Sequence, residues 1–179
     1  MVPIESRIEV SELRAKIPQL SACDKILLSG VVYTARDAAH GRMFQALEQG
    51  RPLPFELRDS VIYYAGPTPT QPGRVIGSCG PTTSGRMDGF TPRLMDLGLV
   101  ATIGKGVRSP QVVEAIVRNG GIYLCALGGA GALVASCVKD CCVVDYEDLG
   151  CESIKRLTVR DLPLIVGVDS RGKSIFDRG

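Results

Sequence analysis

Short apolar runs alternate with amphipathic segments along most of the chain. Runs rich in Val, Ile, Leu and Tyr are typical of buried strands, and they occur at residues 25–33, 60–65, 74–78, 99–103 and 122–127. The amphipathic segments predict helices at 35–49, 91–98 and 110–119, and a glycine turn then leads into a small-residue helix. A terminal hairpin is expected at 162–169 and 174–176. This alternation predicts a single layered α/β domain.

Residue types at the helix ends support these boundaries. Thr34 with Asp37 three residues later matches the capping-box pattern, which makes Thr34 the expected N-cap of the first helix. Ser109-Pro110 has the polar cap and first-position proline that open a helix, and Gly120 follows its last turn.

The domain organisation is simple. We see no internal repeat and no linker, so residues 1–179 are expected to form one domain. Residues 1–24 are the most polar opening segment and are expected to be peripheral, with a short amphipathic piece at 11–17.

Composition excludes several classes of function. The apolar fraction of 45% and the charged fraction of 22% exclude global disorder. A net charge of +2 and the absence of Trp give no footprint for nucleic acid. The uncharged stretch 119–138 is interrupted by five glycines, so no membrane span is expected there.

Cysteine usage points to a reducing compartment. The chain has seven cysteines, an odd number, and no secretory signal opens it, so we expect a cytoplasmic protein with free thiols. Cys137, Cys141, Cys142 and Cys151 are the strongest candidates for a metal or redox site. No C-x2-C pair occurs and the single His40 is distant, so buried thiols are favoured over a metal site and no metal ligand is assigned.

Two nucleotide-binding motifs fail on spacing. Gly98 to Lys105 imitates a phosphate loop, but five residues separate its glycines and Gly106 stands where Ser or Thr is needed. The glycines at 129 and 131 follow a predicted strand, but Val134 stands at the third glycine position of a dinucleotide fingerprint.

Three polar segments remain, each between the end of a predicted strand and the start of a helix: 33–40, 80–88 and 105–109. Ligands of α/β sheets bind at the carboxyl ends of strands, and Arg36, Arg86 and Lys105 supply positive charge there. The segments therefore predict a pocket for a small acid with more than one carboxylate. Each has a plainer alternative. Either arginine can form a surface ion pair with Asp37 or Asp88, and 82–84 can be turn residues. His40 is more simply structural.

The same segments resemble a known family. Val-Tyr-Thr-Ala-Arg-Asp-Ala-Ala-His at 32–40, Tyr-Tyr-Ala-Gly-Pro-Thr-Pro at 63–69, Gly-Pro-Thr-Thr-Ser-Gly-Arg-Met-Asp at 80–88 and Gly-Lys-Gly at 104–106 occur in family order. They resemble the β subunit, or C-terminal domain, of the class I iron–sulfur fumarate hydratase and L-tartrate dehydratase family. The glycine-rich stretch from residue 120 and the region around 149–154 extend the match.

The resemblance implies a swivelling β/β/α fold similar to the mobile domain of aconitase. It also implies a partner α subunit that binds a [4Fe–4S] cluster through its own cysteines, usually in a dimer of αβ pairs. The cluster acts as a Lewis acid in the reversible hydration of fumarate to malate. By the same resemblance, Arg36, Arg86, Lys105 and Thr83 bind substrate, and Thr82 is the base, assisted by Lys105 and Arg86.

Other functions are compatible with the same residues. One is the β subunit of an L-tartrate dehydratase, or of a hydratase acting on a methylated diacid. A stand-alone domain that binds dicarboxylates belongs to a different class and needs no partner. A redox or metal protein built on the four cysteines would bind metal in the isolated chain.

Overall fold

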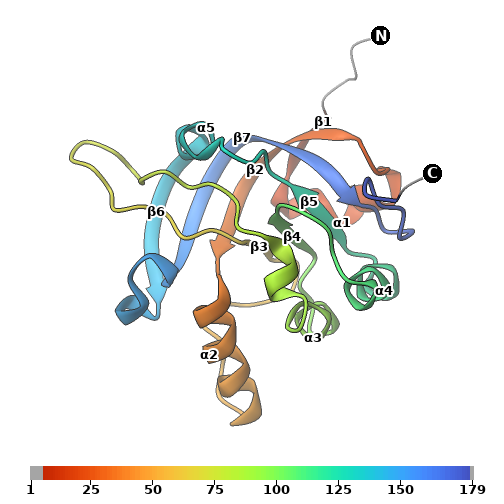
Figure 1. Cartoon of the computed structure of the whole chain (residues 1–179), viewed down its shortest axis with the longest axis horizontal. Coiled ribbons are helices and arrows are strands. Elements are labelled where there is room, and N and C mark those ends of the chain that lie inside the picture. The colour runs from red at the N-terminus through yellow and green to blue at the C-terminus, as the bar shows by residue number, and fades with distance from the viewer. Residues whose placement is uncertain (1–5, 178–179) are drawn as a thin grey trace.

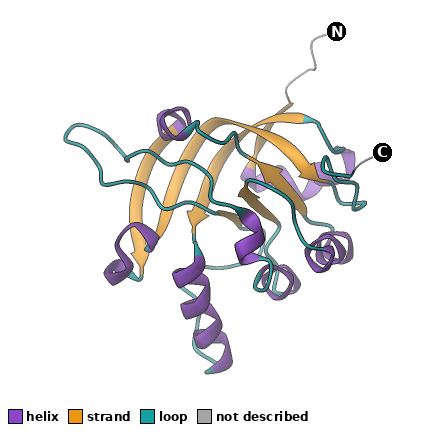
Figure 2. Cartoon of the chain, viewed as in Figure 1, coloured by secondary structure: helices purple, strands orange, loops and turns teal. Residues whose placement is uncertain are grey.

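The computed structural model describes residues 6–177 as a mixed α/β structure (Figures 1 and 2). Its strands are β1 (Ser6–Glu9), β2 (Lys25–Thr34), β3 (Val61–Tyr63), β4 (Ala101–Gly104), β5 (Ile122–Cys125), β6 (Val138–Asp145) and β7 (Ile154–Val168). The α-helices are α1 (Leu13–Lys16), α2 (Asp37–Glu48), α3 (Thr91–Asp96), α4 (Pro110–Asn119) and α5 (Gly131–Cys137). Short 3-10 turns lie at Val10–Glu12, Ile17–Gln19, Ser84–Met87 and Glu147–Glu152.

The sheet closes on itself. Strands β2, β3, β4 and β5 are parallel neighbours, and the long strand β7 runs antiparallel to both β5 and β2. These pairings join five strands into a barrel-like ring, in which β2 and β7 lie side by side as two curved strands (Figure 1). Strands β1 and β6 extend the outer edges of β2 and β7. The α/β class predicted from sequence is confirmed, but the sheet is a closed ring and not a flat layer.

The hydrophobic core has two parts, one on each face of the sheet. Along β3, Val61 and Tyr63 belong to the interior cluster, whereas Ile62 and Tyr64 belong to the cluster under the helices. This alternation follows from the two-residue period of a strand. Helices α2, α3 and α4 lie together on one side of the molecule (Figure 2), and their apolar faces complete the outer cluster.

Several predicted elements are confirmed, with small shifts at their ends. The helix expected at 35–49 is α2, and the helix at 110–119 is α4. Ser109 caps α4 as predicted, because its side chain accepts a hydrogen bond from the Val112 amide at 3.4 Å. Gly120 follows α4 with a φ of +61°, a left-handed conformation that glycine adopts without strain.

The prediction of a strand at 74–78 is wrong. This segment is an irregular loop that folds back on residue 68, where the Thr68 amide donates to the Ser78 carbonyl at 3.0 Å. Gly77 permits this close approach, because a Cβ at that position would lie 2.0 Å from the Thr68 carbonyl oxygen. Its local bonds therefore hold it away from any sheet neighbour.

The predicted hairpin at 162–169 and 174–176 is also wrong in its extent. The apolar stretch at 162–169 is the second half of β7, which begins at Ile154, and a single bridge joins Val168 to Ser174. Strand β6 was not predicted. Most of its residues are exposed at the edge of the sheet, so the sequence shows no buried run there.

The N-terminal segment is part of the core over its described residues, 6–24, and is not peripheral. Strand β1 pairs with β2 in parallel, and Leu13 and Ile17 are fully buried in the interior cluster. The polar composition of the segment did not indicate that it packs into the core, because only one face of it is apolar.

The predicted N-cap at Thr34 is also wrong. Strand β2 continues to Thr34, which pairs with Lys155 of β7, and α2 begins only at Asp37 with Arg36 in the cap position. The Thr34 hydroxyl accepts from the Lys155 amide at 3.1 Å, so sheet pairing takes the side chain that would have capped the helix.

Within residues 6–177, none of the helices has the length and apolar character needed to cross a membrane. The uncharged stretch at 119–138 divides into β5, a glycine-rich turn and α5, as its glycines indicate.

Candidate functional site

The three sequence-predicted segments meet at the carboxyl ends of β2, β3 and β4. The Ala35 amide donates to the Tyr63 carbonyl at 3.2 Å, and the Thr82 amide donates to the Tyr64 carbonyl at 2.7 Å. The Lys105 amide in turn donates to the Thr82 carbonyl at 3.3 Å. This series of backbone bonds places the residues after β2, the threonine loop and the residues after β4 side by side, as expected for parallel strands.

The threonine loop runs alongside the end of β4 at very close range. Thr83 forms a parallel bridge with Lys105, and the Ser84 amide donates to the Lys105 carbonyl at 2.9 Å. Glycine is required at 104, because a Cβ there would lie 2.0 Å from the Ser84 hydroxyl oxygen. The absence of one side chain therefore allows the loop to add onto the sheet.

Arg36 sits at the junction between β2 and α2 and points toward the loop after β3. Its Nη1 would lie 2.8 Å from a Cβ at Gly66, so that glycine makes room for the guanidinium. Arg36 Nε is 4.0 Å from a Glu152 carboxylate oxygen, and it is buried without a hydrogen-bond partner in the described part of the chain. A buried donor without a partner is costly and is a candidate ligand contact.

Arg86 is held by an acidic residue from α2. Its Nε and Nη2 donate to the two Asp37 carboxylate oxygens at 3.0 and 2.6 Å. The ion pair with Asp37, one of the alternatives for Arg86, is therefore present. Both donors lie on one edge of the guanidinium, so Nη1 and the outer Nη2 hydrogen point away from Asp37 and are free for a second carboxylate.

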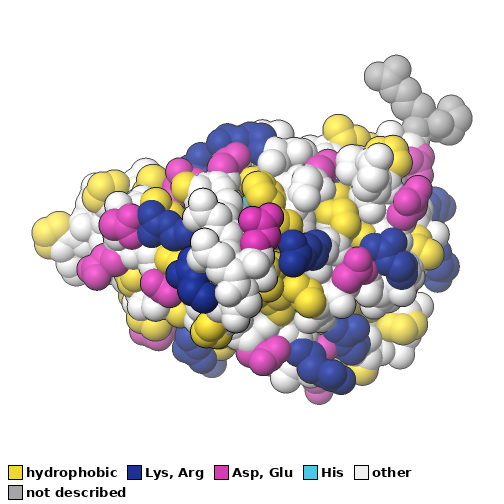
Figure 3. All heavy atoms as spheres, turned by 90° about the horizontal axis from the view of Figure 1, so that it is seen from below, with side chains coloured by type: hydrophobic (Ala, Val, Ile, Leu, Met, Phe, Trp, Pro, Cys, Tyr) yellow, Lys and Arg dark blue, Asp and Glu magenta, His cyan; other side chains and the backbone are white. Residues whose placement is uncertain are grey.

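Lys105 is exposed and, among residues 6–177, has no carboxylate within 4.0 Å. The face seen from below in Figure 3, toward which α2 points, mixes basic and acidic side chains and has hydrophobic side chains between them. The surface charge is therefore mixed, and the attraction for an anion depends on a few placed side chains.

The two threonines differ in exposure. Thr82 is half-buried and Thr83 is exposed, and neither hydroxyl bonds to another residue within 6–177. Ser84, by contrast, is fully buried and its hydroxyl lies 2.9 Å from the Tyr123 hydroxyl. The Ser84 hydroxyl thus has a long-range core contact and not a local turn bond, and the Thr82 and Thr83 hydroxyls are left for a ligand.

His40 is buried beneath this edge and has a structural contact, as its position on an Ala-rich helix indicated. Nδ1 lies 2.8 Å from the Arg36 carbonyl oxygen, so Nδ1 carries the proton and donates to it. The ring packs against Tyr64 and Phe90. Burial lowers the His40 pKa to about 4, so the imidazole is neutral near pH 7.

Arg108 is the functional candidate that sequence reasoning missed. It belongs to the third segment, but its burial could not be read from the sequence, and exposed arginines are far more common. Its side chain is 0% exposed and its Nε donates to Asp88 at 2.7 Å. Asp88 was considered as a partner for Arg36 or Arg86, and it pairs with neither.

The seven cysteines do not fit an iron–sulfur cluster in this chain. All seven are free, and apart from Cys141 and Cys142, which are consecutive in β6, they lie on different elements or loops. Within residues 6–177, no three His, Cys, Asp or Glu side chains gather closely enough to hold a metal ion. Burial raises the pKa of the Cys79 thiol to about 12, whereas a metal ligand must be a thiolate. The cluster that the resemblance implies has no set of ligands among these residues.

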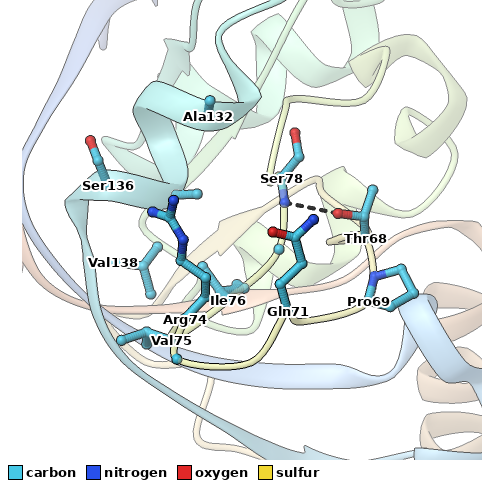
Figure 4. A pocket seen from close by; sticks show the side chains of 13 residues that line it. Thr68, Pro69, Gln71, Arg74, Val75, Ile76, Ser78, Ala132, Ser136 and Val138 are labelled. Carbon is cyan, nitrogen blue, oxygen red and sulfur yellow. Dashed lines mark hydrogen bonds between the residues drawn. The ribbon is translucent and has the colours of Figure 1, made fainter.

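A separate cavity of about 490 Å³ lies between the loop after β3 and α5 (Figure 4). Its lining includes Thr68, Gln71 and Arg74 on the loop side and Ser136 and Val138 on the other. None of the five predicted site residues, all of them described, contributes to this lining. The cavity is therefore not the predicted acid-binding site.

The charges of the predicted site suit a small dicarboxylate. Two guanidinium groups and one ammonium group come from three neighbouring segments. The threonine loop is bonded through its backbone to the segment that carries Lys105, and it adds two hydroxyl groups. Planar guanidinium groups match carboxylates geometrically, and Lys adds a point charge.

The chain is similar to known proteins over nearly its whole length. Residues 3–179 match the family model described as "Fumarase C-terminus". The chain is 34% identical to "Fumarate hydratase 2" of Leishmania major over 179 residues, which are 99% of this chain and 32% of that protein. It is 35% identical to "Fumarate hydratase class I, aerobic" of Escherichia coli K12, with 99% of this chain and 33% of that protein covered.

A third relative is similar over nearly its whole length. The chain is 37% identical over 167 residues to "Putative L(+)-tartrate dehydratase subunit beta" of Methanocaldococcus jannaschii, covering 90% of this chain and 86% of that protein. The chain thus spans about a third of the fumarate hydratases it matches but most of this separate subunit.

Proposed function

The chain belongs to the fumarase C-terminus family, and on that premise we propose that it is the β subunit of a class I fumarate hydratase. The enzyme would be a hydro-lyase that hydrates fumarate to malate reversibly. The observation that carries the proposal is the hydrogen-bonded series from Ala35 to Lys105, because it gathers all the predicted site residues at one sheet edge.

Arg36, Arg86 and Lys105 hold the substrate carboxylates in this proposal. Arg86 presents the guanidinium edge that Asp37 leaves free, and the unpartnered Nε of Arg36 gains an acceptor. Thr83, which is exposed beside Lys105, adds a hydroxyl contact. Charge-assisted bonds of this kind orient a small anion as well as bind it.

Thr82 is the proposed base. In the dehydration direction its deprotonated oxygen takes the proton from the carbon next to a carboxylate. The C–H electron pair forms the double bond, and the hydroxyl leaves the neighbouring carbon with the C–O electron pair as hydroxide, a departure that the cluster on the proposed α subunit would assist as a Lewis acid. A threonine hydroxyl is a weak acid, so its alkoxide needs the positive field of Lys105 and Arg86, and exclusion of water strengthens that field.

A partner subunit completes the site in this proposal. The fumarate hydratases that the chain matches are about three times its length, which leaves room for a cluster-bearing part outside this chain. We place the [4Fe–4S] cluster on that α subunit, because the cysteines here do not gather. An assembly of two αβ pairs fits this proposal.

The proposed enzyme implies a mobile domain and a location inside the cell. We infer a swivelling domain similar to the mobile domain of aconitase, which would close the site over substrate. A cytoplasmic location is supported by the seven free thiols, because a reducing compartment keeps thiols unpaired.

The β subunit of an L-tartrate dehydratase is the second candidate. It is favoured by one specific observation, the 86% coverage of a relative that bears that name as a separate subunit. The predicted residues serve either substrate, since both are dicarboxylates that lose or gain water.

Anaerobic hydration assays test the proposal. We expect malate to form from fumarate only when the chain and its iron–sulfur partner are both present. Thr82→Ala should lower kcat by about 10²–10⁴-fold, the usual contribution of a general base. Thr70→Ala is the matched control, because Thr70 is exposed in the loop after β3 and should leave kcat unchanged.

The outcomes separate the candidates. Turnover of tartrate and not of fumarate supports the second candidate. Binding of dicarboxylate by the isolated chain, with no turnover of either acid by the pair, supports the stand-alone binding domain and contradicts the enzyme proposal.

A further inference from the structure

Arg108 lies fully buried near the loops that carry Thr82 and Lys105, and the function proposed above gives it no role. A buried cation is costly unless every partner is in place. Replacing such a group with an apolar side chain is often neutral or stabilising, so stability alone is a weak reason for its presence. The contacts of Arg108 therefore suggest another reason.

The Arg108 guanidinium makes four hydrogen bonds to four different segments. Nε donates to Asp88 at 2.7 Å and Nη1 donates to Thr102 on β4 at 2.9 Å. Nη2 donates to Thr91 at 2.8 Å and to the Tyr64 hydroxyl at 3.2 Å. Its central carbon also lies over the rings of Tyr64 and Tyr123, at 5.2 and 4.9 Å from their centroids.

Tyr123 connects this guanidinium to both loops of the candidate site. Its hydroxyl donates to the Gly106 carbonyl at 2.8 Å, so it must accept its second bond, at 2.9 Å, from Ser84. Burial raises the pKa of Tyr123, which keeps this donor protonated. Ser84 follows the two threonines, and Gly106 follows Lys105.

Asp88 ties the opposite side of the same network. One carboxylate oxygen accepts from Arg108, and the other accepts from the Ser109 amide at 2.7 Å. The segment after Lys105 and the segment after the threonine loop are thus joined through one partly buried carboxylate. We call Arg108, Asp88, Tyr64 and Tyr123 the buried frame.

We propose that Arg108 is a positioning residue: its buried frame holds in place the two loops whose backbones are bonded at Thr82 and Lys105, and so sets where these two side chains lie. This inference rests on the proposed function. A planar guanidinium with fixed donors determines the geometry of the groups around it more tightly than an apolar side chain can. Misplacement of reacting groups by about 1 Å can cost about 100-fold in rate, so such a frame has a direct effect on the reaction.

The frame predicts a larger effect on kcat than on KM. Arg36 stands at the cap position of α2, and Arg86 lies in the turn Ser84–Met87 and is bonded to Asp37 of α2; neither contacts the frame through a hydrogen bond or ion pair in residues 6–177. Carboxylate binding by these two residues should therefore survive a change in the frame. The relative position of the Thr82 and Lys105 side chains should not survive such a change.

The test uses the chain assembled with its iron–sulfur partner. Arg108→Lys keeps the charge but loses the planar donors, and Tyr123→Phe keeps the ring but loses the hydroxyl. We expect each to lower kcat for fumarate by about 10–100-fold, with KM rising by a smaller factor because Lys105 also binds a carboxylate. The double variant should be far from additive, because both act through one network.

Arg118→Gln is the matched control, because Arg118 pairs with Asp96 on the exposed face of α4 and α3. It should leave kcat and KM unchanged. If Arg108→Lys and Tyr123→Phe assemble and keep kcat within twofold of the wild type, the inference is overturned. If Arg108→Lys does not fold, Tyr123→Phe decides alone by the same criterion.

The reference assay separates this inference from the proposed function. A wild-type pair that turns over fumarate or tartrate, with unaffected variants, overturns the positioning role only. A wild-type pair that turns over no diacid contradicts the proposed function, and the positioning role is overturned with it.

Discussion

Arg86 and Asp37 form a two-bond ion pair at the surface that orients the guanidinium group more than it stabilises the fold. Their side chains are 51% and 37% exposed, and pairs so accessible to water contribute only about 0–1 kcal/mol to stability. The bond through Nε and Nη2 nevertheless fixes the plane of the guanidinium. Its value, in our proposal, lies in holding Arg86 ready for a carboxylate, which reduces the entropy lost on binding.

Asp37→Asn should therefore weaken substrate binding without unfolding the chain. We expect KM for the dicarboxylate to rise by about tenfold, which corresponds to about 1.4 kcal/mol, with the melting temperature nearly unchanged. Asp148→Asn is the control, because Asp148 also accepts two bonds from an arginine, from Nη1 and Nη2 of Arg42, but does not pair with a predicted site residue. Equal KM values in the two variants would contradict the orienting role of Asp37.

His40 makes stability depend on pH. Its folded-state pKa of about 4 lies below the ordinary 6.5, so the unfolded chain binds a proton that the folded chain does not. Stability should be full above pH 6.5 and fall as pH drops toward 4, by roughly 3 kcal/mol at most. Urea unfolding of the wild type between pH 7 and 5 measures this slope.

His40→Gln should flatten that slope, because His40 is the single histidine in the sequence. Three carboxylates, Asp96, Asp148 and Asp169, have pKa values below their ordinary range. They take up protons only at a more acidic pH than His40 does. An equally steep fall in the variant between pH 7 and 5 would show that another group is responsible.

Residue identity alone indicated part of the candidate site. Arg36, Arg86 and Lys105 stood out because charge at a strand end has a simple chemical meaning, and the structure brings their segments together. Arg108 has the same chemistry and lies three residues after Lys105, yet it is buried. Whether an arginine faces solvent or the core depends on partners such as Tyr64 and Thr102, which are distant in sequence, so local pattern could not reveal it.

At the scale of elements, two glycines have opposite roles. Gly104 ends β4, where an added Cβ would meet Ser84 at 2.0 Å and the Tyr64 ring at 2.9 Å. Gly41 lies inside α2, where an added Cβ meets nothing within 4 Å. The first glycine allows the threonine loop to pair with the strand, and the second only weakens its helix.

Alanine at each position should separate these roles. Gly104→Ala should destabilise the chain by about 1–3 kcal/mol and lower the activity of the assembled enzyme, because the loop must move away from β4. Gly41→Ala should stabilise it by about 0.5–1 kcal/mol and leave activity intact. Chemical denaturation and the hydration assay measure both, and a destabilised Gly41→Ala would contradict this account of α2.

Elements with strong local signals were predicted well, and elements defined by distant partners were not. Helix α4 has a capping serine, a proline and a terminal glycine, and its bounds match the prediction. Strand β6 is an exposed edge strand, so it lacks a buried run. The segment 74–78 has strand-like residues but no neighbouring strand, because its loop bonds fold it back on Thr68. Strand formation needs a partner that composition does not specify.

At the scale of the whole molecule, the closed ring determines where the site lies. Pairing between β2 and β7 joins residues more than a hundred positions apart, and no local pattern predicts it. Once the ring closes, the parallel strands β2, β3 and β4 present their carboxyl ends together. The sequence therefore predicted the class of the fold and the edge that carries the site, but not the closure that holds that edge in shape.

The same edge carries exposed apolar side chains that the proposed partner would cover. Val107 and Leu127 are 62% and 53% exposed. Val107 is two residues beyond Lys105, and the Ala126 amide donates to the Gly104 carbonyl at 2.9 Å, which places Leu127 next to the site. Since the chain is about a third of the length of the fumarate hydratases it matches, we expect the proposed α subunit to pack here.

Leu127→Asp tests this surface against Leu97→Asp, which alters an equally apolar side chain, 47% exposed, at the opposite end of the parallel strands. Both variants should fold, because neither side chain is buried. Burial of one leucine is worth about 1.5–3 kcal/mol, so Leu127→Asp should weaken assembly with the iron–sulfur partner by at least about tenfold. Leu97→Asp should assemble normally. Titration of each variant against the partner measures the two affinities, and equal affinities would place the interface elsewhere on the molecule.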